Sequence, residues 1–316
     1  MRNSSKAAFA LLVAASPLTV SSATLPPLDQ AALQLPSQTP EDRVSDPITV
    51  TGTKVTKEVA HSFVREVAVE AAYGQLARWN GPICLRVQGL KPEYSAYIKG
   101  TIIAFANEVR AEVARPGCKI NLVVAFESDP ADFITVLNQT RSDLFDSMSH
   151  HDLERMTAST EAVRTWSRVA TKPADGAGES TLADSGVADL RLGGLVTGRA
   201  YRKYTNSTIE QSTRQDLYAS FITIDLDQIE GKTMQQLSAY VAMLALAQVD
   251  VANPIVAAPT ILNLFHSPET APSDFTDWDI AYVRSLYDSN NRLKANMQQG
   301  TMANLVRREL ADAAKD

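Results

Sequence analysis

The sequence predicts an α+β protein with a mixed, twisted sheet, long helices and a helical C-terminal part. Residues 83–126 carry a strand pattern, a long helix pattern and a second strand pattern in succession. That succession favours two parallel strands joined by a right-handed crossover. A further strand is predicted at 217–226, where bulky apolar residues gather. Helix patterns then fill the C-terminal part, at 233–249, 276–288 and 298–314.

The chain begins with the pattern of a signal peptide over residues 1–23. Arg2 and Lys6 form a short positive region, an apolar run follows, and Ser-Ser-Ala at 21–23 gives a small-residue cleavage site. The apolar run is shorter than the roughly 20 residues that span a membrane, so we expect cleavage rather than anchoring. Residues 24–47 are a leader with Pro, Gln and Ser that we expect to be flexible.

Residues 48–316 are predicted to form one domain, since a mature chain of this size can bury a sizeable core. A short alternating strand at 48–52 precedes a helix at 57–73, whose apolar residues recur every four positions. Residues 141–170 show less regular patterns. Residues 171–186 are rich in Gly, Ala, Ser and Asp without apolar periodicity, which predicts an exposed loop within the domain.

The best-defined unit lies between residues 83 and 126. A strand at 83–88 leads to Pro92, which suits the first turn of a helix predicted at 93–115. Pro116 and Gly117 end that helix, and the strand at 118–126 is apolar almost throughout. A continuously apolar strand is typical of the centre of a sheet that is covered on both faces.

The chain has two cysteines, Cys84 and Cys118, and each opens a predicted strand. In an exported protein such a pair is most simply a disulfide. A metal or redox role is the alternative, but the chain has no Cys-x-x-Cys motif and no histidine near either cysteine in sequence.

Charge and hydropathy restrict the partners. Loss of Arg2 and Lys6 with the signal changes the formal charge from −6 to −8. An acidic chain without a concentrated basic surface argues against nucleic acid as a partner. No segment after the signal is long and apolar enough to span a membrane, so we expect no transmembrane span in the mature chain.

The helix at 233–249 (TMQQLSAYVAMLALAQV) is apolar on nearly every side, which predicts burial. It is followed by a short run at 260–265 and by a helix that carries Trp278-Asp279 and ends with Leu286-Tyr287. This order resembles the C-terminal half of zincin-type zinc-dependent peptidases, and the resemblance extends over about residues 217–288. It implies a zincin-like fold.

Zincins bind zinc through two histidines four positions apart on one helix, with a catalytic glutamate beside the first. The resemblance places the metal positions on Ala239 and Met243 and the catalytic position on Tyr240. Alanine and tyrosine do not replace these roles together, and a lone thioether is a poor zinc ligand. The resemblance therefore implies a fold that lacks zinc catalysis, and we expect no metal and no cofactor.

Arg78 and Trp79 precede the first strand of the best-defined unit. The segment around them resembles the opening of a bacterial exported family of unknown function, other members of which carry a zincin-like helix. The pair is a candidate binding site. The alternative is a surface arginine stacked on an anchoring tryptophan.

Glu127 and Asp129 directly follow the strand at 118–126. Ligands often bind at the carboxyl ends of parallel strands, so these carboxylates are candidate binding residues. The alternative is a capping turn, because Ser128, Asp129 and Pro130 together suit the start of a helix.

The sequence thus predicts an exported, non-catalytic zincin-like protein with a binding or structural role in the bacterial cell envelope, periplasmic or extracellular. Its partner is an unidentified protein or small molecule. The alternative function is a peptidase-like hydrolase that uses a non-zinc site in a cleft beside helix 233–249. A third possibility is an envelope module that docks a partner protein through the exposed loop at 171–186.

Overall fold

The structure is a computed structural model that describes residues 55–69, 74–146, 148–174, 207 and 209–315. The predicted signal peptide, the leader, the strand at 48–52 and residues 175–186 of the predicted loop lie outside the described residues. Within the described ranges, no helix is of the length and apolarity that crossing a membrane requires.

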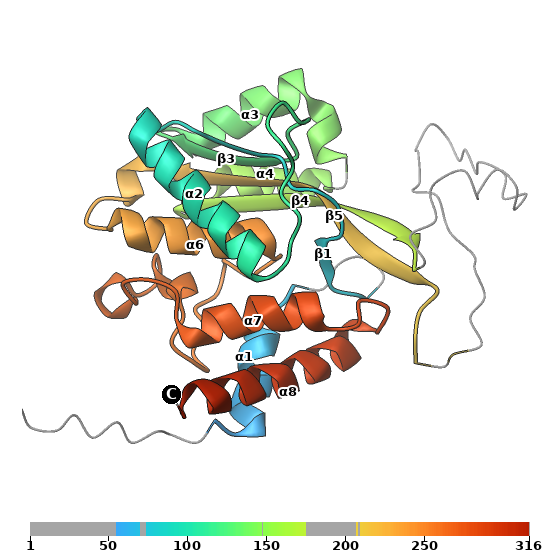
Figure 1. The fold of residues 1–316 in the computed structure, drawn as a ribbon. Coiled ribbons are helices and arrows are strands. Elements are labelled where there is room, and N and C mark those ends of the chain that lie inside the picture. The colour runs from blue at the N-terminus through green and yellow to red at the C-terminus, as the bar shows by residue number, and fades with distance from the viewer. Residues whose placement is uncertain (1–54, 70–73, 147, 175–206, 208, 316) are drawn as a thin grey trace, which may run out of the picture. The chain divides into compact units, whose positions relative to one another are not determined.

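A mixed five-stranded sheet lies at the centre of the described chain (Figure 1). Its strand order is β1-β5-β3-β2, and β4 pairs with β5 as well. The strands are β1 (Ala77–Trp79), β2 (Leu85–Gln88), β3 (Leu122–Glu127), β4 (Val163–Pro173) and β5 (Thr213–Asp225).

β5 organises this sheet. β4 runs antiparallel along one edge of β5, from the pair Pro173 and Thr213 to the pair Val163 and Ile224. β1 and β3 therefore share the other edge, both parallel to β5. β1 lies beside the first half of β5 and β3 beside its second half. The predicted parallel pairing of the strands around 83–126 is confirmed, because β2 and β3 are parallel neighbours.

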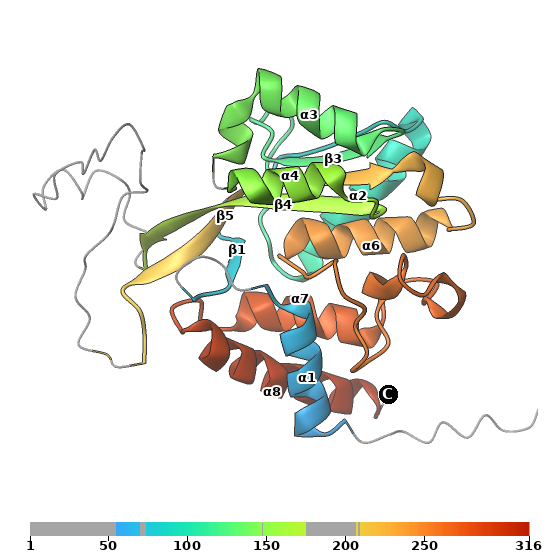
Figure 2. The same cartoon turned by 180° about the vertical axis from the view of Figure 1, so that it is seen from behind.

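Helices cover both faces of the sheet, and the views in Figure 1 and Figure 2 show α2 and α6 on one face and α3 and α4 on the other. A third layer holds α1, α7 and α8, of which α8 packs on both of the others. The helices are α1 (Lys57–Val67), α2 (Pro92–Glu108), α3 (Pro130–Thr140), α4 (His150–Ala158), α6 (Met234–Leu246), α7 (Asp277–Asp288) and α8 (Ala295–Ala313).

Two apolar clusters stabilise these layers. The main one joins α2, α6 and the sheet to the third helix layer. The smaller one lies between the sheet and α3 and α4, where the Trp166 ring stacks between Phe145 and Phe221 at centroid distances of 5.0 and 4.9 Å. The sheet thus buries both faces, as expected for strands as apolar as β3 and β5.

Several element boundaries differ from the sequence prediction. The helix predicted at 93–115 ends at Glu108, because Arg110 adopts a left-handed conformation with φ +60°. Its amide donates to Asn107 O, and the amide of Ala111 donates to Ala106 O at 2.8 Å. These two bonds form a Schellman-type helix end. The helix predicted at 57–73 ends at Val67, after which Ala68 forms a β-bridge with Val249.

The less regular region at 141–170 contains two elements that sequence patterns missed, α4 and most of β4. The strand predicted at 217–226 is longer, because pairing with β4 extends β5 back to Thr213. Gly89, just after β2, has φ +89°, and a side chain there would place its Cβ 1.9 Å from Phe126 O. Only glycine allows this close approach of the β2 end to β3.

Candidate functional site

α6 is the element that carries the candidate site, and its start is well defined. Thr233 Oγ1 accepts from the Gln236 amide at 3.1 Å, and Gln236 Oε1 accepts from the Thr233 amide at 3.1 Å. This reciprocal capping box begins the helix directly after β5 and the turn that follows it. The helix then runs through the core, where every residue from Leu237 to Leu246 is buried.

The three positions assigned by the zincin resemblance lie inside that core. Ala239 and Met243 have no exposed surface, and Tyr240 is 2% exposed. The Tyr240 ring packs edge-on against Phe265, with 5.0 Å between centroids and 72° between planes. Burial, followed by the charge of Glu161, raises the pKa of Tyr240 above its ordinary value. Tyr240 is therefore a neutral packing residue at physiological pH.

The turn after α6 is held by a buried carboxylate. Asp279 near the start of α7 is fully buried and accepts from Thr260 Oγ1 at 2.5 Å and from the Ile261 amide at 3.0 Å. It also accepts from the amide and the hydroxyl of Thr276, each at 2.8 Å. Burial raises the pKa of Asp279, and these hydrogen bonds act in the opposite direction. Asp279 thus fixes the turn at Ile261–Asn263 onto α7.

Arg78 and Trp79 are brought together with the ends of two helices. Arg78 Nη1 donates to Leu286 O at 2.7 Å, to Ser289 O at 3.2 Å and to Tyr287 O, all at the C-terminal end of α7. Trp79 Nε1 donates to Ala245 O at 2.8 Å in the last turn of α6. Burial lowers the pKa of Arg78.

Arg78 Nη1 and Trp79 Nε1 therefore both donate to main-chain carbonyls within the protein. The guanidinium of Arg78 lies over the Tyr287 ring, 5.8 Å from the ring centroid, so an aromatic side chain of α7 contacts this arginine. A cation at a helix C-terminus interacts favourably with the helix dipole, which explains a half-buried arginine here.

The two candidate carboxylates, Glu127 and Asp129, lie at the end of β3 and just after it. Asp129 is the N-cap of α3, and its Oδ1 accepts from the Asp132 amide at 2.9 Å. Of the two alternatives for Asp129, the structure therefore contains the capping turn. Glu127 is the last residue of β3 and is half-buried.

Cys84 and Cys118 are bonded to each other, with 6.0 Å between their Cα atoms. In the described parts of the chain, no three His, Cys, Asp or Glu side chains come close enough together to hold a metal ion.

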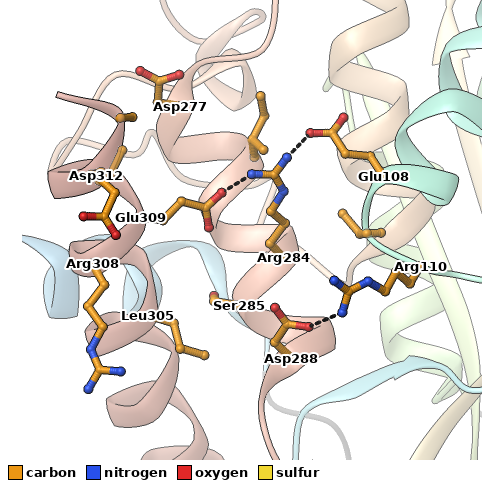
Figure 3. A pocket seen from close by; sticks show the side chains of 14 residues that line it. Glu108, Arg110, Asp277, Arg284, Ser285, Asp288, Leu305, Arg308, Glu309 and Asp312 are labelled. Carbon is orange, nitrogen blue, oxygen red and sulfur yellow. Dashed lines mark hydrogen bonds and ion pairs between the residues drawn. The ribbon is translucent and has the colours of Figure 1, made fainter. Parts of the chain in front are cut away.

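A charged cavity of about 700 Å³ lies between α2, α7 and α8. Figure 3 shows Arg284 of α7 between Glu108 of α2 and Glu309 of α8. Arg284 bonds both carboxylates, with 2.5 Å to Glu108, and Arg110 lies 4.0 Å from Asp288. Because these groups pair with one another, the arrangement ties three helices together.

A smaller cavity of about 150 Å³ lies beside the C-terminal end of α6 and β4. Trp166 and Gln248 border it, and each has a buried polar atom without a partner among the described residues, Nε1 and Oε1 respectively. Sequence reasoning missed both residues, because the cavity unites parts of the chain that are far apart in sequence. No family model, curated protein or solved structure matches this chain.

Proposed function

We propose that this chain is an exported, non-catalytic zincin-like protein with a binding or structural role in the bacterial cell envelope. One observation carries the proposal. The three positions that the resemblance assigns to metal binding and catalysis, Ala239, Tyr240 and Met243, are core residues with at most 2% exposure. A catalytic zinc site needs protein ligands and an open coordination position for water. Buried alanine, tyrosine and methionine side chains offer neither.

The order of elements supports the zincin-like part of this proposal. β5 leads into α6, the turn at Ile261–Asn263 follows, and α7 carries the aspartate that holds the turn. This is the order that the resemblance implies. The antiparallel strand β4 beside β5 agrees with the mixed sheet of such a fold.

Export is supported by one feature in addition to the signal pattern. Disulfides form and persist in oxidising compartments, and Cys84 and Cys118 are bonded here. This bond is compatible with a periplasmic or extracellular protein.

The hydrolase alternative has less support. The cavity of about 150 Å³ beside α6 contains two serines in its lining, Ser167 and Ser220. Their hydroxyls lie 3.2 Å apart and bond to each other. None of the described residues that line it is a histidine, a cysteine or a carboxylate, so these residues offer no general base for a serine nucleophile.

Elemental analysis of protein purified without a tag tests the proposal. We expect far less than one zinc ion per chain, and no cleavage when the protein is incubated with a peptide library. One zinc per chain would contradict the proposal. Cleavage that survives chelators and is abolished by a single substitution in the cavity beside α6 would favour the hydrolase instead.

A further inference from the structure

β4 is an outermost strand of the sheet, and its outer edge has no neighbouring strand among the described residues. It pairs with β5 alone along its 11 residues. Figure 2 shows it between α4 on one face of the sheet and α6 on the other. Long edge strands are usually protected by proline, lysine or a bulge. Pro173 and Lys172 stand at one end, and the pairing is irregular between Arg168 and Val169, so Val163–Ser167 lies outside this protected half.

The pairing with β5 determines which main-chain groups lie on the outer edge. The Asp225 amide donates to Ala162 O and the Ala174 amide donates to Ser212 O, each at 2.9 Å. Main-chain groups alternate between the two edges of a strand, so the even-numbered residues of β4 face β5 and the odd-numbered ones face outward. The described residues form no hydrogen bond with the outward main-chain groups. The outward residues with an amide proton are Val163, Thr165, Ser167, Val169 and Thr171.

The side chains of β4 divide between the two faces of the sheet. Trp166 stacks on Phe145 and Phe221 in the cluster beneath α3 and α4. Successive side chains alternate, so the other even-numbered residues share that face, and Thr165 and Ser167 lie on the face of α6. There they line the cavity of about 150 Å³, the volume of about five water molecules at about 30 Å³ each. None of the described residues that line it carries a charge, so it suits one small apolar side chain.

The face that β4 shares with α3 and α4 carries positive charge without bonded carboxylates. Arg164, Arg168 and Lys172 lie on it at every fourth position, and β4 contains no acidic residue. Among the described residues their one ion pair joins Arg168 Nη2 to Asp146 Oδ2 at 3.9 Å, beyond hydrogen-bond distance. Arg164 Nη1 and Arg168 Nε are buried without a partner in the described chain. Opposite charges on neighbouring strands stabilise a sheet, so this row of cations favours an acidic neighbour.

We propose that β4 binds an extended segment of a partner protein as an additional strand of the sheet. The segment carries carboxylates on the face of α3 and α4 and a small apolar side chain on the face of α6. In this mode of recognition the main-chain hydrogen bonds supply affinity, and alternate side chains supply specificity. The proposal rests on the proposed binding function and names the chemistry of its partner.

A second copy of this chain is a poorer occupant of the edge. Antiparallel pairing of two β4 strands about a twofold axis at Arg168 places this arginine beside its own copy. It also places Arg164 beside Lys172 of the second copy. Like charges directly opposite each other destabilise a strand pair.

A labelled heptapeptide of alternating Glu and Val tests the proposal by fluorescence anisotropy. It carries its carboxylates on one face and small apolar side chains on the other, so we expect a dissociation constant on the order of 100 μM. The same peptide with Lys in place of Glu presents like charges to β4. We expect it to bind more weakly by about tenfold or more.

Methylation of the peptide's main-chain nitrogens tests strand addition and identifies the strand direction. The outward residues of β4 have their side chains on the face of α6, where the Val side chains of the peptide also lie. In an antiparallel pair, hydrogen-bonded residues share a face, so the Val amides face β4, whereas in a parallel pair the Glu amides do. We expect methylation of one set of amides to abolish binding and methylation of the other to change it by less than about twofold.

Variants of the protein test the edge from the other side. Thr165→Pro removes an outward amide and leaves the bonds to β5 in place, so we expect peptide affinity to fall by about tenfold or more. Thr165→Val keeps the amide and is the matched control. Lys172→Glu, exposed at the end of β4, is expected to weaken binding by about two- to fivefold. Lys99→Glu, exposed on α2, is expected to leave it unchanged.

The proposal is overturned if the Glu and Val peptide does not bind at 1 mM, or if the two methylated peptides bind equally. It is also overturned if Thr165→Pro, folded by circular dichroism, binds as Thr165→Val does. Sedimentation that shows a wild-type dimer and a Thr165→Pro monomer assigns the edge to a second copy instead. Binding that appears only after deletion of residues 175–206 assigns it to the chain itself. Such failures in metal-free, inactive protein leave the proposed function in place, whereas stoichiometric zinc overturns that function whatever the peptides do.

Discussion

Arg164, which is buried, and Arg78, which is half-buried, show how an arginine is accommodated inside this protein. Each lies on a strand and donates to main-chain carbonyls at the C-terminal end of a helix. Arg78 does so at α7, and Arg164 donates to Met156 O at 3.1 Å and to Ser159 O at the end of α4. The last carbonyls of a helix have no intrahelical donor, so a guanidinium from a neighbouring strand satisfies several at once.

Arg78→Met tests the importance of this arrangement. The substitution keeps much of the apolar stem but removes the donor to three carbonyls, so we expect the free energy of unfolding to fall by about 2–4 kcal/mol. Arg86→Met on the exposed face of β2 is the matched control and is expected to change it by less than about 0.5 kcal/mol. Urea denaturation measures both. Equal stabilities of the two variants would show that the Arg78 bonds are unimportant in solution.

Asp279 provides a second test at the residue scale. Asp279→Asn preserves the shape but replaces one acceptor oxygen with an NH₂ group that faces donors from Thr260, Ile261 and Thr276. We expect a loss of about 2–4 kcal/mol, because buried donors are left without an acceptor. Asp277→Asn, exposed in the same helical turn, is expected to lose less than about 1 kcal/mol. Thermal unfolding followed by circular dichroism compares them, and a small effect of Asp279→Asn would contradict the assigned anchoring role.

The residue scale also shows where sequence reasoning succeeds. The sequence allows Asp129 to be either a helix cap or a ligand-binding residue. The cap can be predicted locally, because the amide that Asp129 accepts from belongs to Asp132, only three residues later. Arg78 was singled out, but its contacts are with residues more than two hundred positions later. No local pattern contains that information, because the carbonyls of α7 become available only after the helix has docked.

At the scale of elements, the end of α2 is the clearest departure from the sequence pattern. Apolar residues continue at the helical period through Val109 and Val113, which predicted a helix to 115. The main chain reverses at Arg110 instead, with a Schellman-type pair of hydrogen bonds. Tertiary packing explains the difference, since Val113 leaves the helix to form a β-bridge with Ile83.

The conformation at the end of α2 predicts that one substitution, at Arg110, makes the protein more stable. Arg110 has φ +60°, a conformation that glycine adopts without the steric cost that other residues incur. Arg110→Gly is therefore expected to raise the free energy of unfolding by about 0.5–1 kcal/mol, because the exposed ion pair to Asp288 contributes little. Lys99→Gly, exposed within the same helix, is expected to lower it by about 1 kcal/mol. Chemical denaturation measures the change in the free energy of unfolding of each variant. A loss of stability in Arg110→Gly would contradict the prediction.

β4 was missed because its own pattern is weak. Val163–Pro173 includes Arg164, Ser167, Arg168 and Lys172, and its burial does not alternate cleanly. It becomes a strand by pairing with β5 along its whole length. By contrast, α6 was predicted well, because an apolar surface on all sides together with a capping box identifies a buried helix locally.

At the scale of the whole molecule, the disulfide fastens the start of β2 to the segment before β3. Replacing both Cys84 and Cys118 with serine is expected to lower the free energy of unfolding by about 3–4 kcal/mol, because the bond closes a loop of 34 residues in the unfolded chain. Mass spectrometry of the wild-type protein without reductant should detect no free thiol. Reductant should lower the melting temperature of the wild type and leave that of the double variant unchanged, and an unaffected wild type would contradict the prediction.

The position of β5 has a consequence for incomplete chains. This strand touches β1, β3 and β4, and the buried bond between Gln75 and Gln215 joins positions 140 residues apart. A chain that is cut before Thr213 therefore retains β2 and β3 as its only pair of neighbouring strands among those described. Contacts this distant in sequence also slow folding. The complete sheet therefore forms only after β5 has emerged, and a cut between β4 and β5 separates β5 from β1, β3 and β4.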